Sequence, residues 1–180
     1  VERSDLGVLV GSNAAWAHPV LYQRLVQAKQ QNPQMKVVVI DPRRTATCDI
    51  ADRHLAIAPG TDAGLFVGLL NAIVKRGGGV DDFADAPAAR EAAQSWGVER
   101  VAAFGGLPPE EVSAFYQDFI AAPKAITLYT MGINQSSSGS DKCNAIINVH
   151  LAGGKFGREG CGPFSLTGQP NAMGGREVGG

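Results

Sequence analysis

The fold is decided by the segment LGVLVGSN at residues 6–13, a short apolar run closed by a glycine and two polar residues. A continuous apolar run of this length is typical of a strand that is buried on both faces. After the turn, apolar side chains repeat at helical spacing over residues 21–29. Pro19 fits the first turn of that helix, because its missing N–H needs no partner there. The segment therefore predicts a strand, a turn and a helix in succession.

The same alternation recurs along the chain. Further strands are predicted at the apolar runs 36–40, 55–58 and 125–130. Further helices are predicted where apolar residues recur at helical spacing, over 65–74, 112–120 and 143–151. Strands that alternate with helices and are apolar throughout indicate a parallel sheet covered on both faces. The sequence therefore predicts an α/β, Rossmann-like fold.

The predicted domain organisation follows from where this pattern weakens. Residues 1–152 are predicted to form the α/β domain, with one or two short helices at 80–106 as a surface elaboration. Residues 153–180 are rich in glycine and show no periodicity. They are expected to be an extended segment that is incomplete without the rest of a larger protein. Since the chain begins with Val1 and ends with Gly180, both ends are expected to be internal to that protein.

Composition narrows the range of functions. A net charge of −1 and a pI of about 6.3 give no field that would attract nucleic acid or an anionic membrane. No apolar run reaches the length that spans a bilayer. The three cysteines include no CxxC pair, so neither a disulfide framework nor a structural zinc site is expected. We predict no metal ligand and no Ser-His-Asp arrangement in these residues.

Polar turns follow each of the four predicted strands. They are GSN at 11–13, DPRR at 41–44, GTD at 60–62 and MGINQ at 131–135. In an open parallel sheet, ligands bind beyond the carboxyl ends of the strands, where these turns meet. Glycine lets backbone N–H groups approach a phosphate, and the carboxylate of Asp41 stands where a ribose or a base donor commonly lies. The turns therefore predict a nucleotide site.

Some of these residues also have an interpretation that needs no ligand. Asp41 and Pro42 favour an ordinary turn at the end of a strand. Thr61 or Asp62 favours the N-cap of the helix that follows. On local chemistry alone, both interpretations stay open beside nucleotide binding.

The histidines are expected to have structural roles, and the first turn argues against one other functional class. His18 and His54 are expected at the surface or at helix caps, and His150 is expected in the core with its hydrogen bonds satisfied. The turn GSNAAW at residues 11–16 lacks the GxGxxG fingerprint. A nicotinamide-dependent dehydrogenase is therefore disfavoured.

Five segments together resemble a known family, the dimethyl-sulfoxide-reductase class of molybdoenzymes. They are GSNAAWAHP (11–19), IDPRRT (40–45), ADRHLAIAPGTD (51–62), YTMGINQSSSG (129–139) and GPFSLTGQPNAMGGREVGG (162–180). The resemblance covers nearly the whole chain and fades across residues 80–106. Within the class, the chain is most similar to the catalytic subunits of assimilatory nitrate reductases, with the periplasmic nitrate reductases next.

This resemblance implies a site for Mo-bis(molybdopterin guanine dinucleotide), in which two dinucleotides surround one molybdenum atom. Gly11, Ser12 and Asn13 would approach a diphosphate. Asp41, Arg43 and Thr45 would contact the guanosine or phosphate of the same cofactor. Gly60, Thr61 and Asp62 would hold its guanine end. Met131, Gly132 and Gln135 would line the pterin.

The resemblance also implies where the substrate binds. Gln169 and Arg176 would lie in the segment that closes over the active site. Arg176 would steer nitrate, because a guanidinium fork matches a planar oxyanion and stays charged. The molybdenum-ligating residue and the cysteines of a [4Fe-4S] cluster would lie upstream of Val1. The chain alone is therefore expected to be inactive.

The activity implied for the parent protein is reduction of nitrate to nitrite by oxygen-atom transfer. Its electron donor would be ferredoxin, flavodoxin or an NADH-linked reductase subunit, with no nucleic acid and no membrane segment involved. The expected location is cytoplasmic, with a periplasmic location as the alternative. Two alternative functions stay open: formate dehydrogenase or another molybdoenzyme of the class, and a non-catalytic electron-transfer subunit with the same fold.

Overall fold

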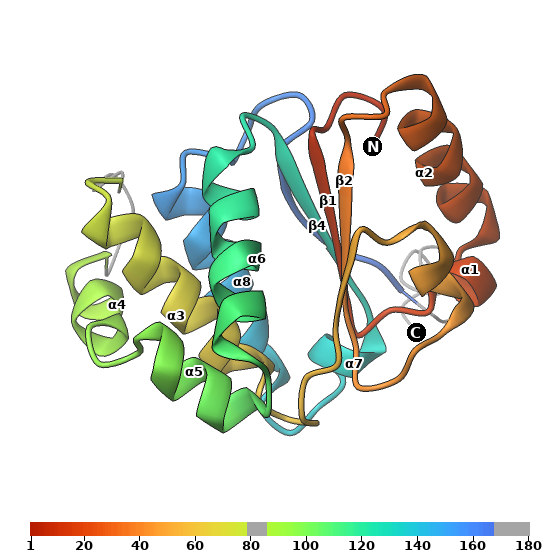
Figure 1. The fold of residues 1–180 in the computed structure, drawn as a ribbon. Coiled ribbons are helices and arrows are strands. Elements are labelled where there is room, and N and C mark those ends of the chain that lie inside the picture. The colour runs from red at the N-terminus through yellow and green to blue at the C-terminus, as the bar shows by residue number, and fades with distance from the viewer. Residues whose placement is uncertain (79–85, 168–180) are drawn as a thin grey trace, which may run out of the picture.

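A five-stranded parallel sheet runs through the middle of the molecule (Figure 1). The computed structural model describes residues 1–78 and 86–167. The strands are β1 (Leu6–Val10), β2 (Lys36–Ile40), β3 (Arg53–Leu55), β4 (Ala125–Tyr129) and β5 (Gly162–Ser165). They lie in the order β3-β2-β1-β4-β5. Because the order reverses at β1 and β4, the carboxyl ends of these two strands form the topological switch point of the sheet.

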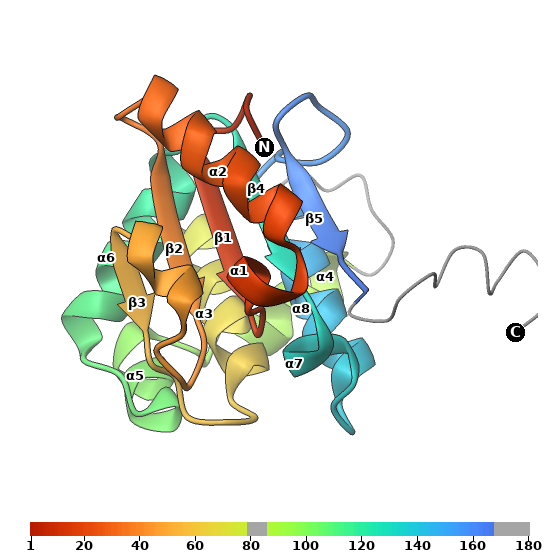
Figure 2. The same ribbon diagram turned by 90° about the vertical axis from the view of Figure 1, so that its right-hand side faces the viewer.

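Helices cover both faces of this sheet. They are α1 (Ala14–Ala17), α2 (Pro19–Gln31), the 3₁₀ helix η1 (Ala46–Ile50), α3 (Asp62–Lys75), α4 (Ala86–Ala93), α5 (Val98–Gly105), α6 (Pro109–Ala121), α7 (Met131–Asn134) and α8 (Gly139–Ala152). Figures 1 and 2 show α3, α5, α6 and α8 on one side and α1 and α2 on the other. The predicted α/β, Rossmann-like fold is confirmed.

The central strand explains why two cores form. Successive side chains of a strand point to opposite faces. Val8 and Val10 of β1 therefore pack into the larger core with α3, α6 and α8, while Leu9 packs into the smaller core under α2. All three side chains are fully buried. An apolar residue at every position of the strand is thus what a sheet covered on both faces requires.

The third and fifth strands differ from the expectation. The third strand was predicted at 55–58 but lies at Arg53–Leu55. Polar residues can belong to this strand because they have partners inside the fold. Arg53 pairs with Glu111 and Asp118 of α6. Ile57, which suggested a strand, is buried just beyond its end.

Strand β5 was not predicted at all. It is an edge strand that contains Pro163, and its Phe164 is 46% exposed, so it carries no apolar run. It pairs with β4, which places residues 162–165 in the same sheet as the rest of the fold. The predicted division of the chain at residue 152 stays a prediction, since it also concerns residues 168–180.

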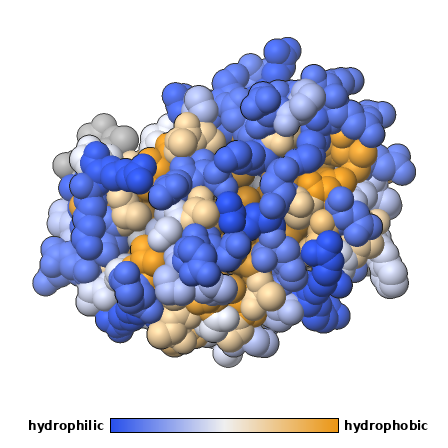
Figure 3. Space-filling view, viewed as in Figure 1, coloured by the Kyte–Doolittle hydropathy of each residue, from blue (hydrophilic) through white to orange (hydrophobic). Residues whose placement is uncertain are grey.

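The surface has two contrasting regions in the view of Figure 3. Hydrophilic residues predominate in its upper part, and hydrophobic residues gather along its lower edge. The carboxyl ends of β1 and β4 point toward this lower edge, where α7 follows β4 (Figure 1).

Within the described residues, no helix is both long and apolar enough to cross a membrane.

His150 of α8 is a buried core residue, as predicted. Its Nδ1–H donates to the carbonyl oxygen of Lys155 (3.0 Å). Since that carbonyl can only accept, Nε2 must be the ring acceptor, and it receives the hydroxyl proton of Thr127 (2.7 Å). The pKa of His150 is lowered to about 4, chiefly by burial; the hydrogen bond to the Lys155 carbonyl opposes this shift, and the positive charge of Lys155 contributes to it.

This lowered pKa makes stability depend on pH. Between about pH 6.5 and pH 4 the unfolded chain binds a proton at His150 that the folded chain does not bind, so stability falls as the pH falls through this window. We expect the free energy of unfolding to drop by about 2 kcal/mol between pH 7 and pH 5 from this group. Urea unfolding of the chain at the two pH values measures the drop.

Two variants separate the effect of His150 from that of other groups. His150→Gln should be less stable at pH 7 but should lose this part of the pH dependence. His18→Gln, which changes a partly exposed histidine, should keep it. An unchanged pH dependence in His150→Gln would show that another group is responsible.

Candidate functional site

The ends of β1 and β4 are joined by two glycines whose backbones touch. The carbonyl oxygen of Gly11 accepts hydrogen bonds from the N–H of Gly132 (3.2 Å) and from Thr130 Oγ1 (2.6 Å). A Cβ on Gly132 would lie 2.7 Å from the Cα of Gly11. Gly11 also has φ +53°, a conformation that L side chains rarely adopt. Both positions therefore need glycine.

A cleft of about 570 Å³ opens beside this junction. It is lined by Gly11, Asn13, Ala17, Asp41, Pro42, Arg43, Pro59, Gly60, Asp62, Thr130, Met131 and Gly132. These residues follow β1, β2, β3 and β4, so all four polar turns contribute to one cavity beyond the carboxyl ends of the strands. This is the place where open parallel sheets bind ligands.

The turn after β1 presents hydrogen-bonding groups that the protein only partly uses. Thr47 of η1 donates its hydroxyl to Asn13 Oδ1 (3.0 Å) and accepts the N–H of Ala15 (3.1 Å). Among the described residues, Asn13 Nδ2 donates to no protein atom. Ser12 is 1% exposed, and its Oγ also has no partner within that part of the chain. An unpartnered buried hydroxyl is costly, so Ser12 fits a site that a ligand completes.

The turn after β2 holds Asp41 in place. Asp41 Oδ1 accepts the N–H of Arg43 (2.8 Å), and its carbonyl oxygen accepts from His54 Nε2 (2.9 Å). Asp41 therefore closes an ordinary strand-ending turn and also lines the cleft, so the two interpretations of this residue are compatible. The guanidinium of Arg43 is 80% exposed at the rim. The buried Oγ1 of Thr45 has no partner among the described atoms.

The turn after β3 contains a buried ion pair that the sequence did not suggest. Asp62, the first residue of α3, is 6% exposed, and its Oδ2 accepts from Lys142 Nζ of α8 (2.8 Å). Lys142 is 3% exposed. The two residues lie far apart in the sequence. Lys142, Ile146 and Val149 do fall on one helical face, and that spacing is the signal that could have identified a buried lysine.

The N-cap prediction for this turn is confirmed in position, although the side chain does not cap the helix. Thr61 occupies the N-cap position of α3, but its side chain makes no capping hydrogen bond. Thr61 Oγ1 instead donates to the carbonyl of Ala58 (2.7 Å). Asp62 lies inside the first turn, where its negative charge is favoured by the helix dipole.

The remaining candidates are distributed as follows. Met131 lines the cleft and is 43% exposed, so it is not a core-packing residue. Gln135 is exposed at the end of α7 and is not part of the cleft wall. Ser12 and Thr61 adjoin lining residues in sequence, and Thr45 lies two positions after Arg43, but none of the three lines the cleft itself. Gln169 and Arg176 lie outside the described residues.

The partly exposed histidines have structural partners. His54 binds the carbonyl of Asp41, as stated above. His18 Nε2 binds the carbonyl of Thr167 (2.6 Å), which ties the start of α2 to the segment after β5. Residues 1–78 and 86–167 contain no group of three or more His, Cys, Asp or Glu placed to hold a metal ion.

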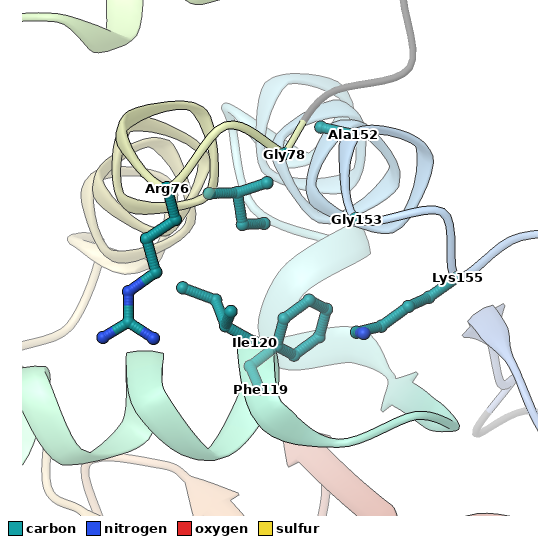
Figure 4. Close-up of a pocket in the computed structure, with 8 residues that line it drawn as sticks. Arg76, Gly78, Phe119, Ile120, Ala152, Gly153 and Lys155 are labelled. Atoms are coloured by element: carbon teal, nitrogen blue, oxygen red, sulfur yellow. The ribbon is translucent and has the colours of Figure 1, made fainter.

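A second cavity, of about 340 Å³, lies at the other end of α3 (Figure 4). It is lined by Ile73, Arg76, Gly78, Phe119, Ile120, Ala152, Gly153 and Lys155. A helix as long as α3 spans about 20 Å, so this cavity is well separated from the cleft at Asp62. Lys155 Nζ already donates to the carbonyl of Ala122 (2.8 Å), and burial lowers its pKa. The polar turns contribute nothing to this cavity.

Comparisons with known proteins show what the whole chain is similar to. A family model described as molybdopterin oxidoreductase matches residues 1–180. A nitrate reductase from Klebsiella oxytoca is 77% identical over 100% of this chain, which spans 21% of that protein. A nitrate reductase from Shewanella frigidimarina is 45% identical over 100% of the chain and 20% of its own length. The chain thus spans about a fifth of the length of these relatives.

Among solved structures, the fold is similar to acetylene hydratase from Pelobacter acetylenicus. The TM-score is 0.76 at 23% identity, covering 87% of this chain and 22% of that one. At this identity the likeness shows a shared fold and nothing more.

The contact between Gly11 and Gly132 can be tested directly. In Gly132→Ala the new Cβ would meet the backbone of Gly11, which must shift, so the free energy of unfolding should fall by about 1–3 kcal/mol. Gly97→Ala is a matched control, because φ there is −75° and the nearest heavy atom to a Cβ is 3.7 Å away. It should change stability by less than about 0.5 kcal/mol. Equal stabilities of the two variants in urea unfolding would contradict the tight junction.

Proposed function

Because the chain belongs to the molybdopterin oxidoreductase family, we propose that its cleft holds one guanine dinucleotide of Mo-bis(molybdopterin guanine dinucleotide) in a nitrate reductase. The family itself implies a molybdopterin cofactor. The dinucleotide form, the residues that bind it and the reduction of nitrate to nitrite by the parent protein are our proposals. The chain would supply a cofactor-binding part of that protein.

One observation carries this proposal. Turns after four strands converge on a single cleft at the switch point, and each turn brings a different kind of group. The β1 turn brings glycine backbone and neutral donors, while the β2 and β3 turns bring the carboxylates of Asp41 and Asp62. A ligand that carries phosphates at one position and N–H or O–H donors at others suits this arrangement.

The residues present fit a dinucleotide. Ser12 Oγ and Thr45 Oγ1 are buried without a partner in the described part of the chain and lie beside the cleft rather than in its wall, so acceptor oxygens of a ligand would satisfy them once the two turns adjust on binding. Glycine at position 11 leaves the backbone open to a phosphate, and Arg43 adds a positive charge at the rim. When it is bound, the molybdenum centre supplies the redox chemistry; this chain binds and orients the organic part of the cofactor.

We assign the residues of the cleft accordingly. Gly11, Ser12 and Asn13 would bind the diphosphate. Asp41, Arg43 and Thr45 would bind guanosine or phosphate. Gly60, Thr61 and Asp62 would hold the guanine. Met131, Gly132 and Gln135 would lie along the pterin, with Gln169 in the closing segment. Phosphate is expected near the β1 turn because that turn contains no carboxylate to repel it.

The substrate assignment rests on nitrate reductase relatives and on Arg176. The relative from Klebsiella oxytoca is named a nitrate reductase. Arg176 would hold the planar nitrate ion by its guanidinium fork.

A [4Fe-4S] cluster outside this chain would pass electrons from ferredoxin, flavodoxin or an NADH-linked subunit. We propose a cytoplasmic location for the parent protein.

The activity is tested on the full-length parent. Protein from molybdenum-replete cells should oxidise a reduced viologen only when nitrate is added, and should form nitrite. Protein from cells grown with tungstate in place of molybdate is the control and should be inactive. The isolated chain of residues 1–180 should also be inactive. A molybdenum-loaded parent that does not turn over nitrate would end the proposal of nitrate reduction.

The role of Arg176 is tested by Arg176→Gln in the parent protein. Loss of a charged hydrogen-bond donor to the anion should raise the KM for nitrate by about tenfold or more. The molybdenum and guanine content should stay unchanged. Arg158→Gln is a suitable control, since Arg158 is exposed and its side chain donates a hydrogen bond only to the carbonyl of Pro123 among the described residues. Equal KM values in the two variants would remove Arg176 from the substrate site.

A further inference from the structure

The buried pair of Asp62 and Lys142 stands at the wall of the cleft. Lys142 Nζ donates to Asp62 Oδ2 (2.8 Å), and both side chains are almost fully buried. Removing two charges from water is costly, so a buried pair of this kind is weak evidence of a stabilising role. Asp62 lines the cleft, whereas Lys142 does not. The pair therefore connects the cleft to the interior of the protein.

The two carboxylate oxygens of Asp62 are in different situations. Oδ2 is engaged by Lys142. Oδ1 accepts no hydrogen bond from the described residues, although a carboxylate can accept several. Asp62 also lies in the first turn of α3, where the helix dipole favours its negative charge. The lysine and the helix together hold a charged acceptor at the cleft wall with one oxygen still available.

This acceptor selects the chemistry of its ligand. A carboxylate repels a phosphate and attracts N–H donors. Among purine edges, guanine offers an exocyclic 2-amino group beside its ring N–H, and hypoxanthine lacks that amino group. A carboxylate held in a fixed orientation can therefore distinguish guanine from hypoxanthine by one charged hydrogen bond. A carboxylate that turns freely would do so poorly, because its orientation must be fixed on binding.

We propose that Lys142 is a positioning residue for guanine recognition. It fixes the Asp62 carboxylate by holding Oδ2, so that Oδ1 accepts a hydrogen bond from the guanine amino group. This inference rests on the proposed dinucleotide site and goes beyond it in naming a residue that touches no ligand. An ammonium group suits the task because it is a point charge that binds one oxygen, whereas an arginine fork commonly engages both.

The test uses the full-length protein prepared without cofactor, with GDP and IDP as probes in titration calorimetry. The wild type should bind GDP about tenfold more tightly than IDP, which is the value of one charged hydrogen bond. Lys142→Met should reduce this ratio to roughly one to two, chiefly by weakening GDP binding. A residue with a merely structural role would weaken both nucleotides equally and leave the ratio unchanged.

Two further variants keep the test decisive. Lys155→Met removes another buried lysine, one that lies at the second cavity and donates to Ala122, so it should keep the wild-type ratio. Lys142→Gln retains a hydrogen-bond donor without the charge and protects against failure of Lys142→Met to fold. It should reduce the ratio at least threefold, as expected when a charged contact becomes a neutral one.

The outcomes separate this inference from the proposed function. If wild type and both Lys142 variants prefer GDP equally, the role of Lys142 is overturned while the nucleotide site stands. If the wild type binds GDP and IDP equally, Asp62 does not read the amino group and the inference also falls. If the wild type binds neither nucleotide, the proposed dinucleotide site itself is wrong.

Discussion

Backbone contact between Gly11 and Gly132 sets how closely the ends of β1 and β4 approach. The Gly11 carbonyl accepts from both Thr130 and Gly132, so the two turns are fixed to each other rather than merely adjacent. Without a side chain at either position, the junction stays narrow, and the cleft opens beside it. Asn13 and Met131, which lie next to these turns in sequence, both line the cleft beside this contact.

The charges around the cleft are arranged by the same elements that build the sheet. Asp41 is oriented by its own turn and by His54, and Asp62 is oriented by Lys142 of a helix that follows β4. The Asp62 carboxylate is thus held by a residue outside the cleft and the Asp41 carboxylate by the N–H of Arg43 in its own turn, while the turn after β1 is left without a negative charge. A ligand with both phosphates and base donors meets a different environment at each end.

Much of this arrangement could be predicted from the sequence, because β1 and β2 are almost entirely apolar, with only Lys36 at the start of β2 as a charged exception, and each is followed by a polar turn. Because both faces of these strands are buried, the pattern predicts a parallel sheet that is covered on each side. Strand β5 was missed because an edge strand with Pro163 and an exposed Phe164 needs no such pattern. Lys142 was missed because its partner is remote in sequence, and a pair of that kind is brought together only by the packing of α3 on α8.

The placement of β5 at the margin of the sheet affects how the isolated chain behaves in solution. Among the described strands it pairs only with β4, so one row of its backbone groups has no strand beside it. Such an edge is a template for pairing between molecules and promotes aggregation. Pro163 offers partial protection, since a proline removes one N–H from the row. The isolated chain should therefore be handled at low concentration, or with the unpaired edge of β5 covered.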